Sequence, residues 1–123
     1  NELKSQFRPS LITIWLGAND AALLDGPNRL QNVPLDEYRS RLASIVNAVE
    51  THLSEGSKVL LITPPTVVDS DRTLKDRNNA AAGEYARACV EVARAEGVAV
   101  LDVYAHINST YPDELKRKAL FVD

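Results

Sequence analysis

The residues of this sequence best suited to chemistry are Gly17, Ala18, Asn19 and Asp20, a small polar turn directly behind the apolar run 11–16. A short run rich in β-branched residues and closed by glycine predicts a buried strand. The turn then lies at the carboxyl end of a strand, where open α/β sheets bind their ligands. The amide N–H of Asn19 can stabilise an oxyanion, so acyl transfer is the first chemistry to consider.

Short apolar runs alternate with long amphipathic stretches, which predicts the elements that position this turn. The apolar runs are 11–16, 59–62 and 98–101. The first helical stripe consists of Tyr38, Leu42, Ile45, Val49 and Leu53, with Gly56 as the expected C-cap. The second stripe consists of Ala82, Tyr85, Cys89, Val92 and Ala93, and ends at Gly97. A short helix is expected over about 112–120.

This alternation predicts an α/β fold with a parallel sheet, because right-handed crossovers join such strands. At 123 residues the chain has the length of one domain, 1–123. The apolar strands predict burial on both faces of the sheet under covering helices. Three strands make a small sheet in which at least one edge strand lacks a hydrogen-bonding neighbour, so we expect a truncated domain.

Composition excludes several classes of partner. The net charge is −3 and there is no basic stripe, so nucleic acid is not expected as a partner. We expect Lys116, Arg117 and Lys118 to form a solvated helix end. No apolar run is long enough for a membrane span. The single Cys89 forms no internal disulfide, so nothing marks an oxidising compartment and the cytoplasm is favoured.

An ordered set of landmarks resembles the SGNH (GDSL-type) hydrolases, and among them most of all the isoamyl acetate-hydrolysing esterases. The landmarks are Gly-Ala-Asn-Asp at 17–20, Pro-Leu-Asp-Glu-Tyr at 34–38, Leu-Ile-Thr-Pro-Pro at 61–65, Gly-Glu-Tyr-Ala at 83–86 and Val-Leu-Asp-Val at 100–103. The resemblance implies a three-layer αβα, flavodoxin-like fold. It also implies that N-terminal strands and a C-terminal helix of that fold are missing.

The same resemblance implies roles for particular residues. Asn19 would donate to the oxyanion, and Asp123 would be the aspartate of an Asp-x-x-His block. Gly17 and Ala18 would line the substrate, while the carboxylate of Asp20 would organise the loop by accepting backbone N–H bonds. The nucleophilic serine and an oxyanion glycine would precede this sequence, and the histidine would follow it. We therefore expect an internal fragment, without a starting Met and inactive alone.

The implied parent is a serine esterase that hydrolyses short-chain acyl esters through a Ser-His-Asp triad, with a small-molecule ester as substrate and no metal or organic cofactor. One alternative is an acyltransferase, which shares the acyl-enzyme. Another is a non-catalytic, truncated paralogue that serves as a binding module. The oligomeric state stays open, although an exposed sheet edge could drive association.

Each candidate residue also has an ordinary structural explanation. Asn19 and Asp20 are common turn formers, and Asp123 could be an exposed carboxylate near a chain end. Cys89, on an apolar helix stripe, is expected to be a packed thiol. We expect His52 to be partly exposed and His106 to be structural. The segment 69–71 lacks the glycine and distal glutamate of a calcium loop, which predicts solvated loop.

Overall fold

The structure is a computed structural model that describes residues 8–53 and 55–121. Its strands β1 (Leu11–Trp15), β2 (Lys58–Ile62) and β3 (Ala99–Leu101) form a parallel sheet in the order β1-β2-β3. In the register, Ile14 lies beside Leu61, and Leu61 beside Val100. The predicted parallel α/β arrangement is confirmed.

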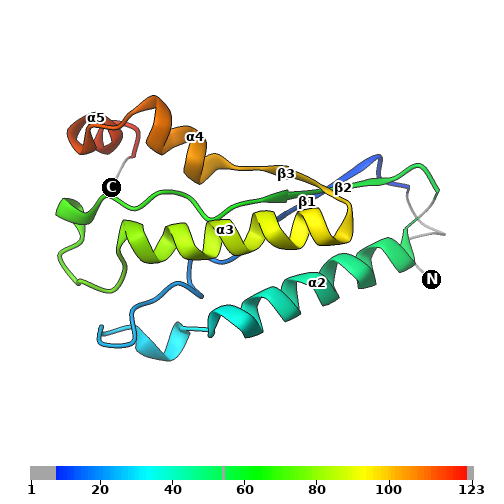
Figure 1. The fold of residues 1–123 in the computed structure, drawn as a ribbon, viewed down its shortest axis with the longest axis horizontal. Coiled ribbons are helices and arrows are strands. Elements are labelled where there is room, and N and C mark those ends of the chain that lie inside the picture. The colour runs from blue at the N-terminus through cyan, green and yellow to red at the C-terminus, as the bar shows by residue number, and fades with distance from the viewer. Residues whose placement is uncertain (1–7, 54, 122–123) are drawn as a thin grey trace.

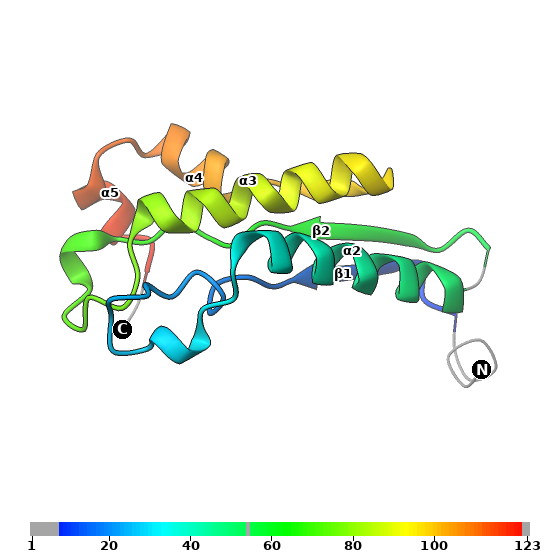
Figure 2. The ribbon, with the colours of Figure 1, turned by 60° about the horizontal axis from the view of Figure 1, so that its bottom comes forward.

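Two long helices cover one face of this sheet. Helices α2 (Leu35–His52) and α3 (Asn79–Glu96) pack against each other on the same side (Figures 1 and 2). Both crossovers step in the same direction along the sheet, and right-handed crossovers of that kind place their helices on one face. The core lies between these layers and includes Val59 and Leu61 of the central strand.

The opposite face of the sheet is exposed in the part of the chain that the structure describes. Leu11, Trp15 and Leu101 keep 53%, 57% and 49% of their surface accessible. The prediction that all the strands are buried on both faces is therefore wrong for β1 and β3. Both are edge strands, and the helices that follow β1 and β2 lie on the other face. The Trp15 indole Nε1–H donates to the backbone carbonyl of Thr63 at 2.9 Å.

Helix α2 begins behind Pro34, with Asp36 and Glu37 favourably placed in its first turn. Its buried residues are Tyr38, Leu42 and Val46. The predicted stripe was wrong at one position, because Ile45 is exposed and the neighbouring Val46 is fully buried. The predicted C-cap was also wrong. The helix ends at His52 with Leu53 as its cap, and Gly56 adopts a φ of 91° in the turn that follows.

Helix α3 is set by capping at both ends. The Asn78 side chain accepts the Ala81 N–H at 2.7 Å, and Gly97 closes the helix in the left-handed conformation. The predicted C-cap is therefore confirmed. The predicted inner face is confirmed as well, because its members Ala82, Tyr85, Cys89, Val92 and Ala93 are all buried.

The chain continues into two short helices beyond the sheet, and α4 (Val103–Thr110) was not predicted. Asp102 caps it by accepting the Ala105 N–H at 3.0 Å. Helix α5 (Glu114–Lys118) falls within the expected segment and ends in basic residues. Two 3-10 turns, η1 (Arg29–Gln31) and η2 (Asp69–Asp71), lie in the loops. Within the described residues, no helix combines the length and apolarity needed to cross a membrane.

Candidate active site

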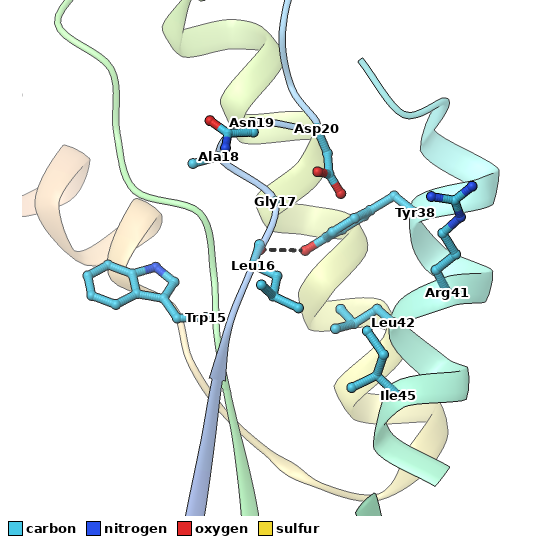
Figure 3. Close-up of a pocket in the computed structure, with 10 residues that line it drawn as sticks. All are labelled: Trp15, Leu16, Gly17, Ala18, Asn19, Asp20, Tyr38, Arg41, Leu42 and Ile45. Carbon is cyan, nitrogen blue, oxygen red and sulfur yellow. Dashed lines mark hydrogen bonds between the residues drawn. The ribbon is translucent and has the colours of Figure 1, made fainter. Parts of the chain in front are cut away.

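The turn 17–20 lies between two cavities at the carboxyl end of β1. Ala18 and Asn19 are exposed and line both cavities. The first cavity, of about 360 Å³, lies between the turn and α2 (Figure 3). The second, of about 570 Å³, lies between the turn and the loop after β2, and Phe121 also lines it. A ligand in either cavity would therefore meet the Asn19 segment.

The backbone at Gly17 requires glycine. Its φ is 120°, and a Cβ built there would lie 2.7 Å from Pro64 Cγ and 2.9 Å from Tyr38 Oη. The Tyr38 hydroxyl donates to the backbone carbonyl of Leu16 at 3.1 Å, as the dashed line in Figure 3 shows. The buried Gly17 thus lets β1 turn sharply beneath Pro64 and Tyr38, and Asn19 follows on the surface.

Asp20 joins the turn to the segment before α2. Its backbone carbonyl accepts the Val33 N–H at 3.1 Å and Asn32 Nδ2–H at 3.3 Å. The bonds that tie it to this segment thus come from the carbonyl, whereas the sequence suggested its carboxylate. Burial raises the pKa of the Asp20 carboxyl, and the nearby Arg41 guanidinium opposes that shift.

Arg77 contacts the turn from a loop that is distant in sequence, and the sequence reasoning missed it. Its Nε–H donates to the Ala18 carbonyl at 2.9 Å, and Nη2–H donates to Asn19 Oδ1 at 3.0 Å. Nη2 also donates to Gln31 Oε1 at 2.5 Å. Within residues 8–53 and 55–121, the Asn19 Nδ2 group makes no hydrogen bond. The amide is thus bonded through its oxygen, and its N–H donors are available to a ligand.

Behind Arg77 lies a buried carboxylate, Asp76. Its Oδ1 accepts from Arg72 Nη2 at 2.6 Å, and its Oδ2 from Arg77 Nη1 at 2.5 Å and Asn28 Nδ2 at 2.8 Å. The Arg72 hydrogen bonds, with help from Asn28, hold the pKa of Asp76 down at about 2 despite its burial. This carboxylate therefore stays ionised and keeps both guanidinium groups in place.

The loop after β2, which forms one wall of the second cavity, is tied to α3 and α4. Asn79 Oδ1 accepts from Thr66 Oγ1 at 2.7 Å and from the Val67 N–H at 2.9 Å. Asn79 Nδ2 donates to Asn108 Oδ1 at 2.9 Å. Side chains thus satisfy the polar groups where this wall meets the helices, and the cavity keeps a defined shape.

The other candidate residues lie apart from the turn or outside the described residues. Cys89 is buried, and burial raises the pKa of its thiol to about 11, which confirms a packed thiol. His52, His106 and the segment 69–71 are exposed. Asp123 lies outside the residues that the structure describes. Among residues 8–53 and 55–121, no group of three or more His, Cys, Asp and Glu side chains is arranged to hold a metal ion.

The parallel sheet and its covering helices define an α/β protein. The polar turn and its two cavities lie at the carboxyl end of a strand, where proteins of this class bind their ligands, and they form the candidate site. Residues 1–119 match the model of the GDSL-like Lipase/Acylhydrolase family. The chain therefore belongs to the GDSL-like lipase/acylhydrolase family, as the landmarks suggested.

Known proteins agree with this assignment. The chain is 41% identical over 104 residues to the isoamyl acetate-hydrolyzing esterase 1 homolog of Rattus norvegicus, covering 78% of this chain and 41% of that protein. The chain thus spans less than half of that relative's length. Other relatives from Mus musculus and Bos taurus carry the same name, at 40% and 36% identity.

Two solved structures share its fold. One is a lipase/acylhydrolase from Enterococcus faecalis, with a TM-score of 0.65, 24% identity, and coverage of 91% of this chain and 57% of that one. The other is Axe2, an acetylxylan esterase from Geobacillus stearothermophilus, with a TM-score of 0.64 and 21% identity. That match covers 85% of this chain and 46% of that one. The fold is therefore that of SGNH/GDSL hydrolases.

Proposed function

We propose that the full-length protein is a serine esterase that hydrolyses short-chain acyl esters, acetate esters above all. The observation that carries this is the position of Asn19, exposed at the carboxyl end of β1 with its Nδ2–H group unpaired in the described residues. The names of similar proteins support the choice of ester, since one is named as a homolog of an isoamyl acetate-hydrolyzing esterase and another as an acetylxylan esterase.

In this proposal a serine attacks the ester carbonyl, with a histidine as general base and then general acid. The proposal assigns both residues to parts of the protein outside these 123 residues, as the family resemblance implies. Asp123 fixes the imidazole tautomer and stabilises the imidazolium. Asn19 Nδ2, together with backbone N–H groups, binds the tetrahedral oxyanion, while Gly17 and Ala18 line the acyl group. The proposal requires no cofactor.

The test is hydrolysis of 4-nitrophenyl acetate by the full-length protein and its Asn19→Ala variant. Because one oxyanion donor is removed, kcat should fall by about 10²–10³. Asn47→Ala, at an exposed position on α2, is the matched control and should keep wild-type turnover. Wild-type kcat in Asn19→Ala would remove Asn19 from the mechanism.

The same assay separates the two alternative functions. Repeating it with a short alcohol present measures how the acyl group divides between water and alcohol. Predominant transfer to the alcohol would identify an acyltransferase. A folded full-length protein with no turnover on any small acyl ester would instead point to a non-catalytic binding module.

A further inference from the structure

We propose that Arg77 is a positioning residue that holds the Asn19 amide with its Nδ2–H directed toward the developing oxyanion, and that Asp76 holds Arg77. This inference rests on the proposed role of Asn19 and adds to it. Arg77 lies 58 residues further along the chain, outside every landmark of the resemblance.

The chemistry of arginine fixes which end of the amide it faces. A guanidinium carries five N–H donors and no acceptor. The Asn19 atom that lies 3.0 Å from Arg77 Nη2 must therefore be the carbonyl oxygen Oδ1. The two ends of an amide point in different directions, so the Nδ2 donor is turned away from Arg77. This orientation is the one that an oxyanion donor needs.

Arg77 is itself held from several directions. Its guanidinium donates to Asp76 Oδ2, to the Ala18 carbonyl and to Gln31 Oε1, at 2.5, 2.9 and 2.5 Å. Only 13% of its side chain is exposed. A planar, rigid group with fixed partners loses little freedom for each further hydrogen bond. Arg77 therefore gives Asn19 a stationary partner that a mobile surface side chain would not provide.

Without that partner, the terminal amide of asparagine rotates over a broad range. In the reversed orientation it would place an acceptor oxygen against the negatively charged oxyanion. The resulting loss would appear in the transition state, because only there does the charge develop. Removing Arg77 should therefore lower kcat and leave KM little changed.

Arg72 provides the matched control. It donates to the other oxygen of the same carboxylate, Asp76 Oδ1, through Nε at 3.2 Å and Nη2 at 2.6 Å. In the described residues, Arg72 makes no hydrogen bond to the turn 17–20. Changing Arg72 thus disturbs the buried ion pair but removes none of the hydrogen bonds that Arg77 makes to Ala18 and Asn19. Its effect on the amide must pass through Asp76 and Arg77 and should be weaker than that of a change at Arg77 itself.

The experiment is a double-mutant cycle in the full-length protein with 4-nitrophenyl acetate. Arg77→Met removes the guanidinium, and Arg77→Lys keeps a cation beside Asp76 but cannot reproduce the fork of donors. Each change is made alone and with Asn19→Ala, and Arg72→Lys is treated in the same way. Circular dichroism and the midpoint of urea unfolding verify that each variant folds. If Arg77→Met fails to fold, Arg77→Lys decides the question.

Each Arg77 variant alone should lower kcat by about ten- to a hundredfold, with KM changed less than about threefold, because the donor is misdirected but still present. With Asn19→Ala already in place, the Arg77 change should cost no further kcat. The part of the kcat loss that depends on Asn19 should be smaller for Arg72→Lys than for either Arg77 variant, because Arg72 reaches Asn19 only through Asp76 and Arg77.

Equal loss from the Arg77 change in both backgrounds would overturn the positioning role while leaving Asn19 as the oxyanion donor. The positioning role is likewise overturned if KM alone rises, or if Arg72→Lys shows the same dependence on Asn19. Wild-type kcat in Asn19→Ala is a different result, because it refutes the proposed function and this inference together.

Discussion

Replacing Gly17 by alanine should destabilise the protein much more than the same change at Gly56. Both glycines adopt a positive φ, 120° at Gly17 and 91° at Gly56. The difference lies in the surroundings. A Cβ at position 17 would lie 2.7 Å from Pro64 Cγ, whereas a Cβ at position 56 would meet nothing within 4 Å. The comparison therefore separates steric clash from backbone strain.

The magnitude follows from these two contributions to the free energy of unfolding. A strained positive φ costs an L-residue about 1–3 kcal/mol, and this cost lowers the stability of both variants. Alanine also restricts the unfolded chain, which raises the free energy of unfolding of both variants by about 0.4–1 kcal/mol. Overpacking against Pro64 and the Tyr38 ring adds about 1–3 kcal/mol at position 17 alone. We therefore expect Gly17→Ala to be less stable than Gly56→Ala by that last amount.

The assay is urea unfolding of the full-length protein and of both variants, followed by circular dichroism, with free energies taken from the midpoints and slopes. Ester hydrolysis by the folded variants provides a second measurement. Relief of the clash must move Pro64, Tyr38 or the turn itself, so Gly17→Ala should also lose turnover through Asn19. Equal midpoints for Gly17→Ala and Gly56→Ala would refute the inference that Pro64 and Tyr38 require glycine.

Two further predictions concern the loop behind the turn. The pKa of Asp76 is about 2 in the folded protein against an ordinary 3.8, so the unfolded chain binds more protons in that range. Its stabilising contribution should be complete above about pH 4 and should fall as the pH drops toward 2; Asp76→Asn should abolish this part of the pH dependence of urea unfolding. Asn78→Ala should lower the free energy of unfolding by about 1 kcal/mol, because it removes the N-cap of α3. Asn78→Ser should keep most of the stabilisation that the cap provides, because serine is also a good N-cap residue. A full loss in Asn78→Ser would contradict the capping explanation.

The order of strands and long helices could be predicted from the sequence because each depends on local patterns. Apolar runs mark the strands, and the stripe from Ala82 to Ala93 marks the buried face of α3. Helix α4 was missed because Val103, Tyr104 and Ile107 are residue types that favour strands. Its place is fixed instead by a cap and by packing, since a Cβ on Gly83 would lie 2.6 Å from Tyr104 Oη.

The candidate site was predictable only where its residues are neighbours in sequence. Asn19 follows β1 directly, so the strand pattern made it a candidate, and the ordered landmarks of the resemblance gave it the expected oxyanion role. Arg77 contacts Asn19 from 58 residues away, and its loop has no periodicity that would reveal the contact. The burial of the two faces of the sheet could not be predicted from local patterns either. Runs of apolar residues do not show that both crossover helices lie on one face, which leaves Trp15 exposed.

In the turn 17–20, hydrogen bonds occupy the acceptor groups and leave one side-chain donor available. The carbonyls of Gly17, Ala18, Asn19 and Asp20 accept from Ala21, Arg77, Ala22 and Val33 in turn. Arg77 also occupies the amide oxygen of Asn19. The amide nitrogen of that side chain is left with no partner inside the described residues, and it lies where two cavities meet. Electrostatic stabilisation of a transition state is most effective when its donors need no reorganisation, so a turn already fixed on its acceptor side meets that requirement.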